Sequence, residues 1–191
     1  AYEVVSKPDV VVDPKTKKTK RKSRITKNTL VRERLKILSV QNQVRFKYVV
    51  FDSWFSSKEN MVMIRTDLKK HCVCAIKANR TLALSEADKR HGHFVQVSSV
   101  EIPPTELRVV YLKGVDFPVV LAKQVFTNKD GSSGVLYLVS SDTDLTYAQL
   151  TTIYHRRWNV EEFHKSLKQN VALEKSPTRI ETTQKNHIFA S

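Results

Sequence analysis

Hydrophobic residues in the first half of the chain alternate between strand spacing and helix spacing. The β-rich run Phe46–Phe51 predicts a short strand that ends at Asp52, and the apolar run His71–Ala78 predicts a second strand. Between them, Ser56–Lys70 predicts a helix whose cap is one of its first two serines. The order of strand, acid, helix and strand is typical of a layered α/β domain.

The N-terminal segment predicts a strand, a basic loop and a helix. Ala1–Val12 is apolar and β-branched, and it breaks at Asp13-Pro14. The run Lys15–Arg24 has seven basic residues in ten and no acid, so we expect a loop that either lies beside phosphates or is simply solvated. Apolar residues at helical spacing in Asn28–Asn42 predict a helix capped by one of its first two residues.

A different pattern follows, in which short β-rich segments are separated by proline and glycine. From Thr81 to Ser141 this pattern predicts antiparallel hairpins, which interrupt the helix and strand alternation. We therefore expect residues 1–79 to form the first part of a core, residues 80–143 a β-rich insertion, and residues 144–191 the rest of the core.

The segment Asp142–Asn170 has no proline or glycine and predicts one long helix, with Thr146 and Gln149 as a capping box. Its polar stripe and its apolar side lie roughly opposite each other. The stripe holds Tyr154, Arg157, Glu161, Lys165 and Lys168, and the apolar side, expected to pack on a sheet, holds Ile153, Val160, Phe163 and Leu167. Spacing alone favours an ordinary amphipathic helix whose charges form simple i,i+4 pairs.

Composition adds a partner class to this picture. Lysine and arginine number 33 against 19 acids, so the formal charge is +14 and the pI is about 9.8, which favours nucleic acid as the partner. No apolar run approaches the roughly 20 residues of a membrane span. Cys72 and Cys74 share one face of a predicted strand, which suits a reducing cytoplasm, and the rest of a zinc pattern is absent around them.

The residue types on the long helix resemble a known signature. Tyr154-x2-Arg157-x3-Glu161-x6-Lys168 is similar to the YREK motif of bacterial insertion-sequence DDE transposases. The likeness extends to FDSWFSSKENM at Phe51–Met61 and to IKANR at Ile76–Arg80. The resemblance implies a ribonuclease H-like mixed sheet with flanking helices, interrupted by an antiparallel β-rich insertion.

The resemblance also implies a mechanism and a set of site residues. DNA cleavage and strand transfer at insertion-sequence ends would use two divalent ions, Mg²⁺ or Mn²⁺, held by Asp52 and Glu161 as the catalytic metal ligands. Tyr154, Arg157 and Lys168 would contact phosphates of the transposon end. The partners would be double-stranded transposon and target DNA and a second copy of the intact transposase, at the nucleoid in the bacterial cytoplasm, without a membrane.

One element of the family pattern is missing. The family uses a first catalytic acid on an upstream core strand, whereas Asp9 and Asp13 flank the entry to a basic loop and do not replace it. We therefore expect this chain to be a fragment with little activity by itself. Two alternatives stay open: a nuclease of the same fold that cuts without joining, and a non-catalytic DNA-binding remnant. Trp54 and Trp158 are expected to be core or cleft-wall aromatics instead of base-stacking residues.

Overall fold

The computed structural model describes residues 7–127, 130–170, 180, 182–184 and 186. It divides into two compact units, which are described separately. The larger unit comprises Val31–Arg157, and the smaller unit combines Ala1–Leu30 with Trp158–Ser191.

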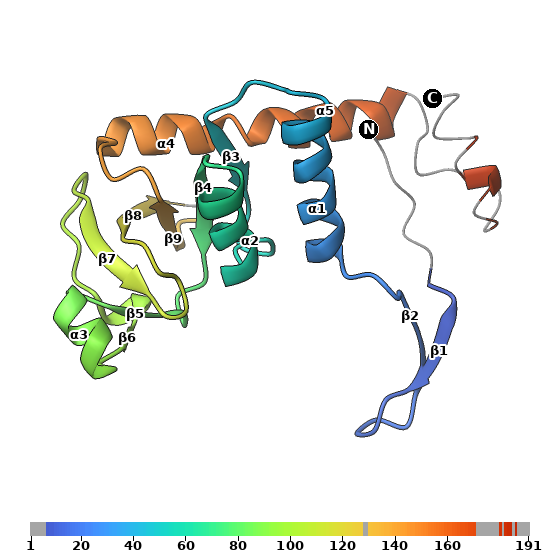
Figure 1. The fold of residues 1–191 in the computed structure, drawn as a ribbon, viewed down its shortest axis with the longest axis horizontal. Helices are drawn as coiled ribbons and strands as arrows, with labels where there is room; N and C mark the ends of the chain where they lie inside the picture. Colours follow the sequence, from blue (N-terminus) through green and yellow to red (C-terminus); the bar gives the residue numbers. More distant parts are fainter. Residues whose placement is uncertain (1–6, 128–129, 171–179, 181, 185, 187–191) are drawn as a thin grey trace. The chain divides into compact units, whose positions relative to one another are not determined.

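A seven-stranded mixed sheet forms the centre of the larger unit (Figure 1). Its spatial order is β3-β4-β9-β8-β7-β5-β6; β3 and β4 pair in parallel, and the other neighbours pair antiparallel. The strands are β3 (Tyr48–Phe51), β4 (His71–Ile76), β5 (Thr81–Ala83), β6 (Val95–Gln96), β7 (Arg108–Leu112), β8 (Val119–Thr127) and β9 (Ser133–Ser140). This arrangement confirms the predicted α/β class with a mixed sheet.

The β-rich segment continues the sheet that β3 and β4 begin. β9 pairs with β4, with Val73 opposite Ser140, and on its other side with β8. The division into core, insertion and core stays a prediction. A short helix that the sequence reading missed, α3 (Glu86–His91), lies between β5 and β6, and it has its own local signals: a Ser85 N-cap and Gly92 in the left-handed conformation at its end.

Two helical segments contain π-helical turns within the larger unit. α2 (Lys58–Val62) continues into η2 (Met63–Asp67), and Ser57 caps it as predicted, accepting a hydrogen bond from the Asn60 amide. α1 (Lys27–Lys36) likewise continues into η1 (Ile37–Gln41). The expected cap of α1 was wrong by two or three positions, because the hydroxyl of Thr26 accepts from the Thr29 amide at 3.1 Å.

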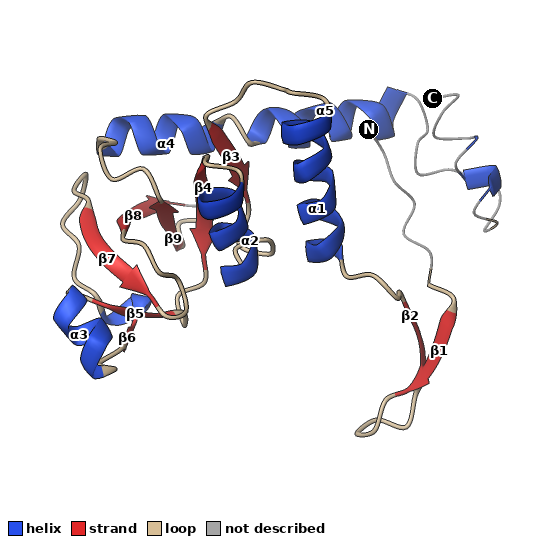
Figure 2. Ribbon diagram, viewed as in Figure 1, coloured by secondary structure: helices blue, strands red, loops and turns tan. Residues whose placement is uncertain are grey.

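β4 is buried on both faces, and its side chains alternate between two hydrophobic clusters. Figure 2 shows the strands of the larger unit with α2 and α4 beside them. One cluster joins Cys72, Cys74 and Ile76 to Met61 and Ile64 from α2 and η2, and the other joins Val73 and Ala75 to Leu150 and Tyr154 from α4 (Tyr147–His155). The sheet is therefore covered on both sides at β4, which fixes the two loops that follow β3 and β4.

The expected single long helix is divided into two. α4 begins after the Thr146 cap, whose capping box with Gln149 is confirmed, and α5 (Trp158–Asn170) follows a turn at Arg156-Arg157. In that turn the Arg157 amide donates to the Tyr154 carbonyl at 3.0 Å, a tightened i to i+3 spacing. The apolar side is divided as well: Ile153 packs in the core, whereas Val160 and Phe163 are about half exposed, contrary to the prediction.

The smaller unit holds α5 and a two-stranded antiparallel hairpin. β1 (Asp9–Val12) pairs with β2 (Thr19–Lys22), so part of the basic run that was expected to be a loop is a strand. Asp13 stabilises the turn, because its Oδ1 accepts from the amides of Lys15 and Thr16 at 3.0 and 3.1 Å. β2 has no apolar residue, so the pattern of apolar residues did not predict this strand.

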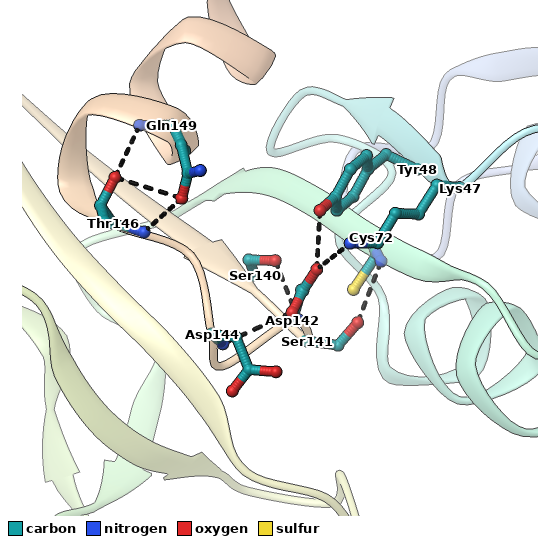
Figure 3. Close-up of polar contacts among 9 residues, drawn as sticks. All are labelled: Lys47, Tyr48, Cys72, Ser140, Ser141, Asp142, Asp144, Thr146 and Gln149. Carbon is teal, nitrogen blue, oxygen red and sulfur yellow. Dashed lines mark hydrogen bonds and ion pairs between the residues drawn. The ribbon is translucent and has the colours of Figure 1, made fainter.

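A buried carboxylate fastens the beginning of β3 to the end of β9 (Figure 3). Asp142 is 5% exposed, and its Oδ2 accepts a hydrogen bond from the Tyr48 hydroxyl at 2.6 Å and lies 3.0 Å from the Lys47 ammonium. We call these three residues the Asp142 clamp. Burial by itself would raise the pKa of Asp142, but the hydrogen bonds from Tyr48 and Lys47 outweigh it and lower the pKa.

Removal of one hydrogen bond should weaken the clamp measurably. Tyr48→Phe is expected to lower the free energy of unfolding by about 1–2 kcal/mol, because the buried Asp142 carboxylate loses a charge-assisted hydrogen bond. Urea denaturation at neutral pH measures the change, and Tyr111→Phe on β7 is the matched control.

The decrease in the free energy of unfolding at acidic pH provides a second test of the clamp. The contribution of Asp142 is complete above the ordinary aspartate pKa of about 3.9 and is lost as the pH falls through the lowered folded pKa. If Asp142→Asn lost as much unfolding free energy on acidification as the unsubstituted protein, the role of the clamp would be contradicted.

Candidate active site

Asp52 lies directly after β3, at the carboxyl end of the parallel pair. Its Oδ1 accepts a hydrogen bond from the Trp54 amide at 2.9 Å, and its carbonyl accepts from the Phe55 amide at 3.3 Å. A turn of this kind fixes an aspartate side chain relative to its own backbone. The half-buried carboxylate is therefore held at the sheet edge where ligands of open α/β folds bind.

A pocket of about 340 Å³ opens beside Asp52. It is formed by the two loops that follow β3 and β4, which open at the same end of the sheet because these strands are parallel. We call it the strand-end pocket; its lining residues are Ser53, Trp54, Ser56, Ser57, Lys77, Asn79 and Arg80. Two of these residues are cationic and none is acidic, so the pocket favours an anionic group.

Arg80 is the most firmly held cation of the strand-end pocket. Its Nη1 donates a hydrogen bond to the Ser56 carbonyl, and its Nη2 lies 3.9 Å from the Met61 sulfur. Burial lowers the pKa of the Arg80 guanidinium, which nevertheless stays protonated at neutral pH because arginine does not titrate in that range. The pocket thus contains a fixed positive charge.

Tyr154 and Arg157 form a second group in the same unit. The Tyr154 side chain is 5% exposed, and the Arg157 guanidinium carbon lies 5.3 Å from the centre of its ring. Burial raises the pKa of the Tyr154 hydroxyl; the Asp52 charge adds to the increase, and the charge and hydrogen bond of Arg157 oppose it. The charges of Asp52 and Arg157 therefore both act on the Tyr154 hydroxyl, in opposite directions.

The other two predicted site residues lie in the smaller unit. Glu161 is in the first turn of α5 and Lys168 in its last turn, and both side chains are exposed. Seven residues of α-helix place them two turns apart on one face, roughly 10 Å along the axis. The pairing of Glu161 with Asp52 stays a prediction.

Oxygen ligands, not sulfur, fit a metal ion in this chain. In the part of the chain that the structure describes, no three or more His, Cys, Asp or Glu side chains gather in one group. Burial raises the pKa of both thiols, Cys72 and Cys74, and so keeps them protonated, which disfavours a zinc site there. The Asp52 carboxylate has the donor chemistry of a magnesium ligand but needs carboxylates from elsewhere to complete a site.

The β1–β2 hairpin carries the densest positive charge of the smaller unit. Residues 9–24 contain seven basic residues against two acids, and both acids are in ion pairs, Lys20 with Asp13 at 2.9 Å and Arg24 with Asp9 at 3.2 Å. Successive valines of β1 point to opposite faces, and all three are exposed, at 63%, 44% and 57% for Val10 to Val12. The hairpin is thus a cationic ribbon with both faces exposed.

Sequence reasoning did not assign a role to Lys77 or Arg80, although they lie in the matching segment Ile76–Arg80. Parallel pairing of the two predicted strands was the missing information, because it brings the loop after β4 next to the loop after β3. Trp54 lines the wall of the strand-end pocket, one of the two places predicted for it, and its side chain is 66% exposed. This exposure leaves the indole face accessible to a base, which the prediction did not expect.

None of the helices in the described residues is both long enough and apolar enough for a membrane span.

Comparison with known proteins identifies the family. No curated protein matches the chain. A family model described as archaeal putative transposase ISC1217 matches residues 8–188. That match covers nearly the whole chain and agrees with the mixed sheet and flanking helices of a ribonuclease H-like fold, so the chain belongs to this family of DDE transposases.

Proposed function

We propose that the protein cuts and rejoins DNA at insertion-sequence ends in a reaction that depends on divalent metal ions, Mg²⁺ or Mn²⁺, held by Asp52 and Glu161. Membership in the DDE transposase family supports the reaction class. The observation that carries the assignment of Asp52 is its fixed place after β3, beside the strand-end pocket. Its charge also raises the pKa of the Tyr154 hydroxyl.

The proposed roles follow from the chemistry of each side chain. Bound divalent ions would activate the attacking oxygen and stabilise charge on the phosphorus. The Trp54 amide orients the Asp52 carboxylate, which would hold the ions together with Glu161. Arg157, held against the Tyr154 ring, would present its planar guanidinium to a phosphate, and Lys168 would act as a mobile point charge.

Double-stranded DNA is the partner that the family implies. The cationic β1–β2 hairpin supports a role in contacting its backbone, because basic side chains that neutralise phosphates provide binding energy independent of sequence. A ribbon of two strands also fits the width of the major groove. The predicted homodimer stays a prediction.

A second candidate is a non-catalytic DNA-binding protein of the same family. It is favoured by the lack of a three-acid group among the described residues, together with the strongly basic composition. A nuclease that cuts without joining is the third. A strand-transfer assay on insertion-sequence ends distinguishes all three, because only the transposase yields both cut and joined products.

Replacement of either proposed metal ligand should abolish cleavage. Asp52→Asn and Glu161→Gln, made in the transposase that carries this chain, keep the side-chain shape but remove a charged oxygen ligand, so we expect a rate loss of at least about 100-fold. DNA binding, measured in parallel, should persist. Glu162→Gln is the control, since it makes the same change at the neighbouring exposed position of α5. Cleavage at the native rate by Asp52→Asn or Glu161→Gln would contradict the proposal.

Arg157 and Lys168 should each contribute one phosphate contact. Arg157→Gln and Lys168→Gln are expected to weaken binding to a transposon-end duplex and to reduce the slope of log K against log salt by about 0.9 each. Titrations at several salt concentrations give the slope. Lys36→Gln, an exposed cation at the end of α1, is the control. An unaltered slope in both variants would remove them from the DNA contact.

The hairpin should contribute to DNA binding without regard to sequence. A combined Lys17→Gln, Lys18→Gln and Arg21→Gln variant is expected to lower the salt slope by about 2.7 on transposon-end and random duplexes alike. These three substitutions leave the Lys20–Asp13 and Arg24–Asp9 ion pairs of the hairpin in place. A loss confined to the transposon end, or none on either duplex, would show that the hairpin does not bind the backbone in this way.

A further inference from the structure

The strand-end pocket combines a flat apolar group with positive charge. Trp54 presents an indole that is 66% exposed, in a loop that its own amide fixes to Asp52. Single exposed hydrophobic side chains are common on protein surfaces. An indole that lines a pocket beside two cations is a more specific arrangement, because aromatic faces and basic groups together match the two chemical parts of a nucleotide.

The positive charges of the pocket differ in mobility. Arg80 is fixed by its hydrogen bond to the Ser56 carbonyl and is partly buried, whereas Lys77 is exposed at the end of β4. A fixed guanidinium binds a phosphate with little loss of side-chain entropy, and a flexible ammonium can adjust to it. No acid in the lining opposes them.

We propose that the strand-end pocket binds one unstacked nucleotide of a DNA strand, with its base against the Trp54 indole and its phosphate at Lys77 and Arg80. A volume of about 340 Å³ lies within the range of small-molecule sites. Ser53 and Asn79 supply hydrogen-bonding groups for the edge of a base. The inference rests on the proposed function for the presence of a DNA strand at Asp52.

A nucleotide bound in this pocket would be positioned next to Asp52. Trp54 follows Asp52 by two residues in the same turn, so a nucleotide held on the indole lies next to the proposed catalytic carboxylate. Stacking does not depend on base identity, since every base has a π face. The pocket would therefore hold a strand near the site without selecting its sequence, and it would do so without metal ions.

Tryptophan fluorescence tests this binding directly. The chain has two tryptophans, so Trp158→Phe leaves Trp54 as the reporter. With a chelator present, a single-stranded oligothymidine of eight nucleotides should quench Trp54, whereas an abasic strand of the same length should not. Trp54→Ala should weaken binding of the oligothymidine by about 5- to 100-fold, as expected of one base stack, and Trp54→Phe should retain most of it.

The phosphate half of the proposal has its own variant. Lys77→Gln should weaken both the oligothymidine and the abasic strand, and Lys69→Gln, an exposed lysine before β4, is the matched control. Circular dichroism establishes that each variant is folded. Equal quenching by the abasic strand, unchanged binding by Trp54→Ala, or equal effects of Lys77→Gln and Lys69→Gln would each overturn the proposal.

These outcomes are separable from the proposed function. The fluorescence measurement needs neither metal nor cleavage. If Asp52→Asn loses cleavage but the oligothymidine does not quench Trp54, only the proposed nucleotide site is contradicted. If the oligothymidine quenches Trp54 but Asp52→Asn and Glu161→Gln cleave at the native rate, only the catalytic assignment is contradicted.

Discussion

Parallel pairing of β3 with β4 is the constraint on which the candidate site depends. Parallel strands end at the same edge of a sheet, so the loop carrying Asp52 and the loop carrying Lys77 and Arg80 open side by side. Every other described neighbour in this sheet pairs antiparallel. Because β3 and β4 pair in parallel, Asp52 and the two cations come together at the same end of the sheet.

The opposite end of β3 has a different purpose. The Asp142 clamp includes Tyr48 at the beginning of β3, whereas Asp52 follows Phe51, so Tyr48 and Asp52 are roughly 13 Å apart along the extended strand. Asp142 is saturated by its hydrogen bonds and is buried, which suits a structural group. Asp52 is half buried and borders a pocket, which suits a group that meets a ligand. One short strand thus separates a buried, hydrogen-bonded acid from a half-buried acid beside a pocket.

The sequence predicted those elements whose signals are local. The strands at Tyr48 and His71, the Ser57 cap and the capping box at Thr146 each depend on a few adjacent residues, and all are confirmed. The turn at Arg156-Arg157 has no proline or glycine to indicate it, and it divided the helix that was expected to carry the whole stripe. β2 was missed because charged residues dominate a strand whose side chains are all exposed.

Site prediction had the same limit. Asp52 was predicted because an acid at the end of a short strand is visible in the sequence, and Tyr154 and Arg157 were predicted through a motif resemblance; their roles stay predictions. The strand-end pocket depends on which strands are neighbours, and hydrophobic spacing carries no such information. Sheet topology supplied the contribution of Lys77 and Arg80.

The position of β3 at the border of the sheet has a geometric consequence. Among the described strands, β4 occupies one side of β3, so the backbone amides and carbonyls on its other side face outward. An edge of this kind is a template for another strand. Any strand that added there would line up its side chains with those of Tyr48 to Phe51, and whichever residue reached the level of Asp52 would become its immediate lateral neighbour. The border of the sheet is therefore the side on which a further strand could pair next to Asp52.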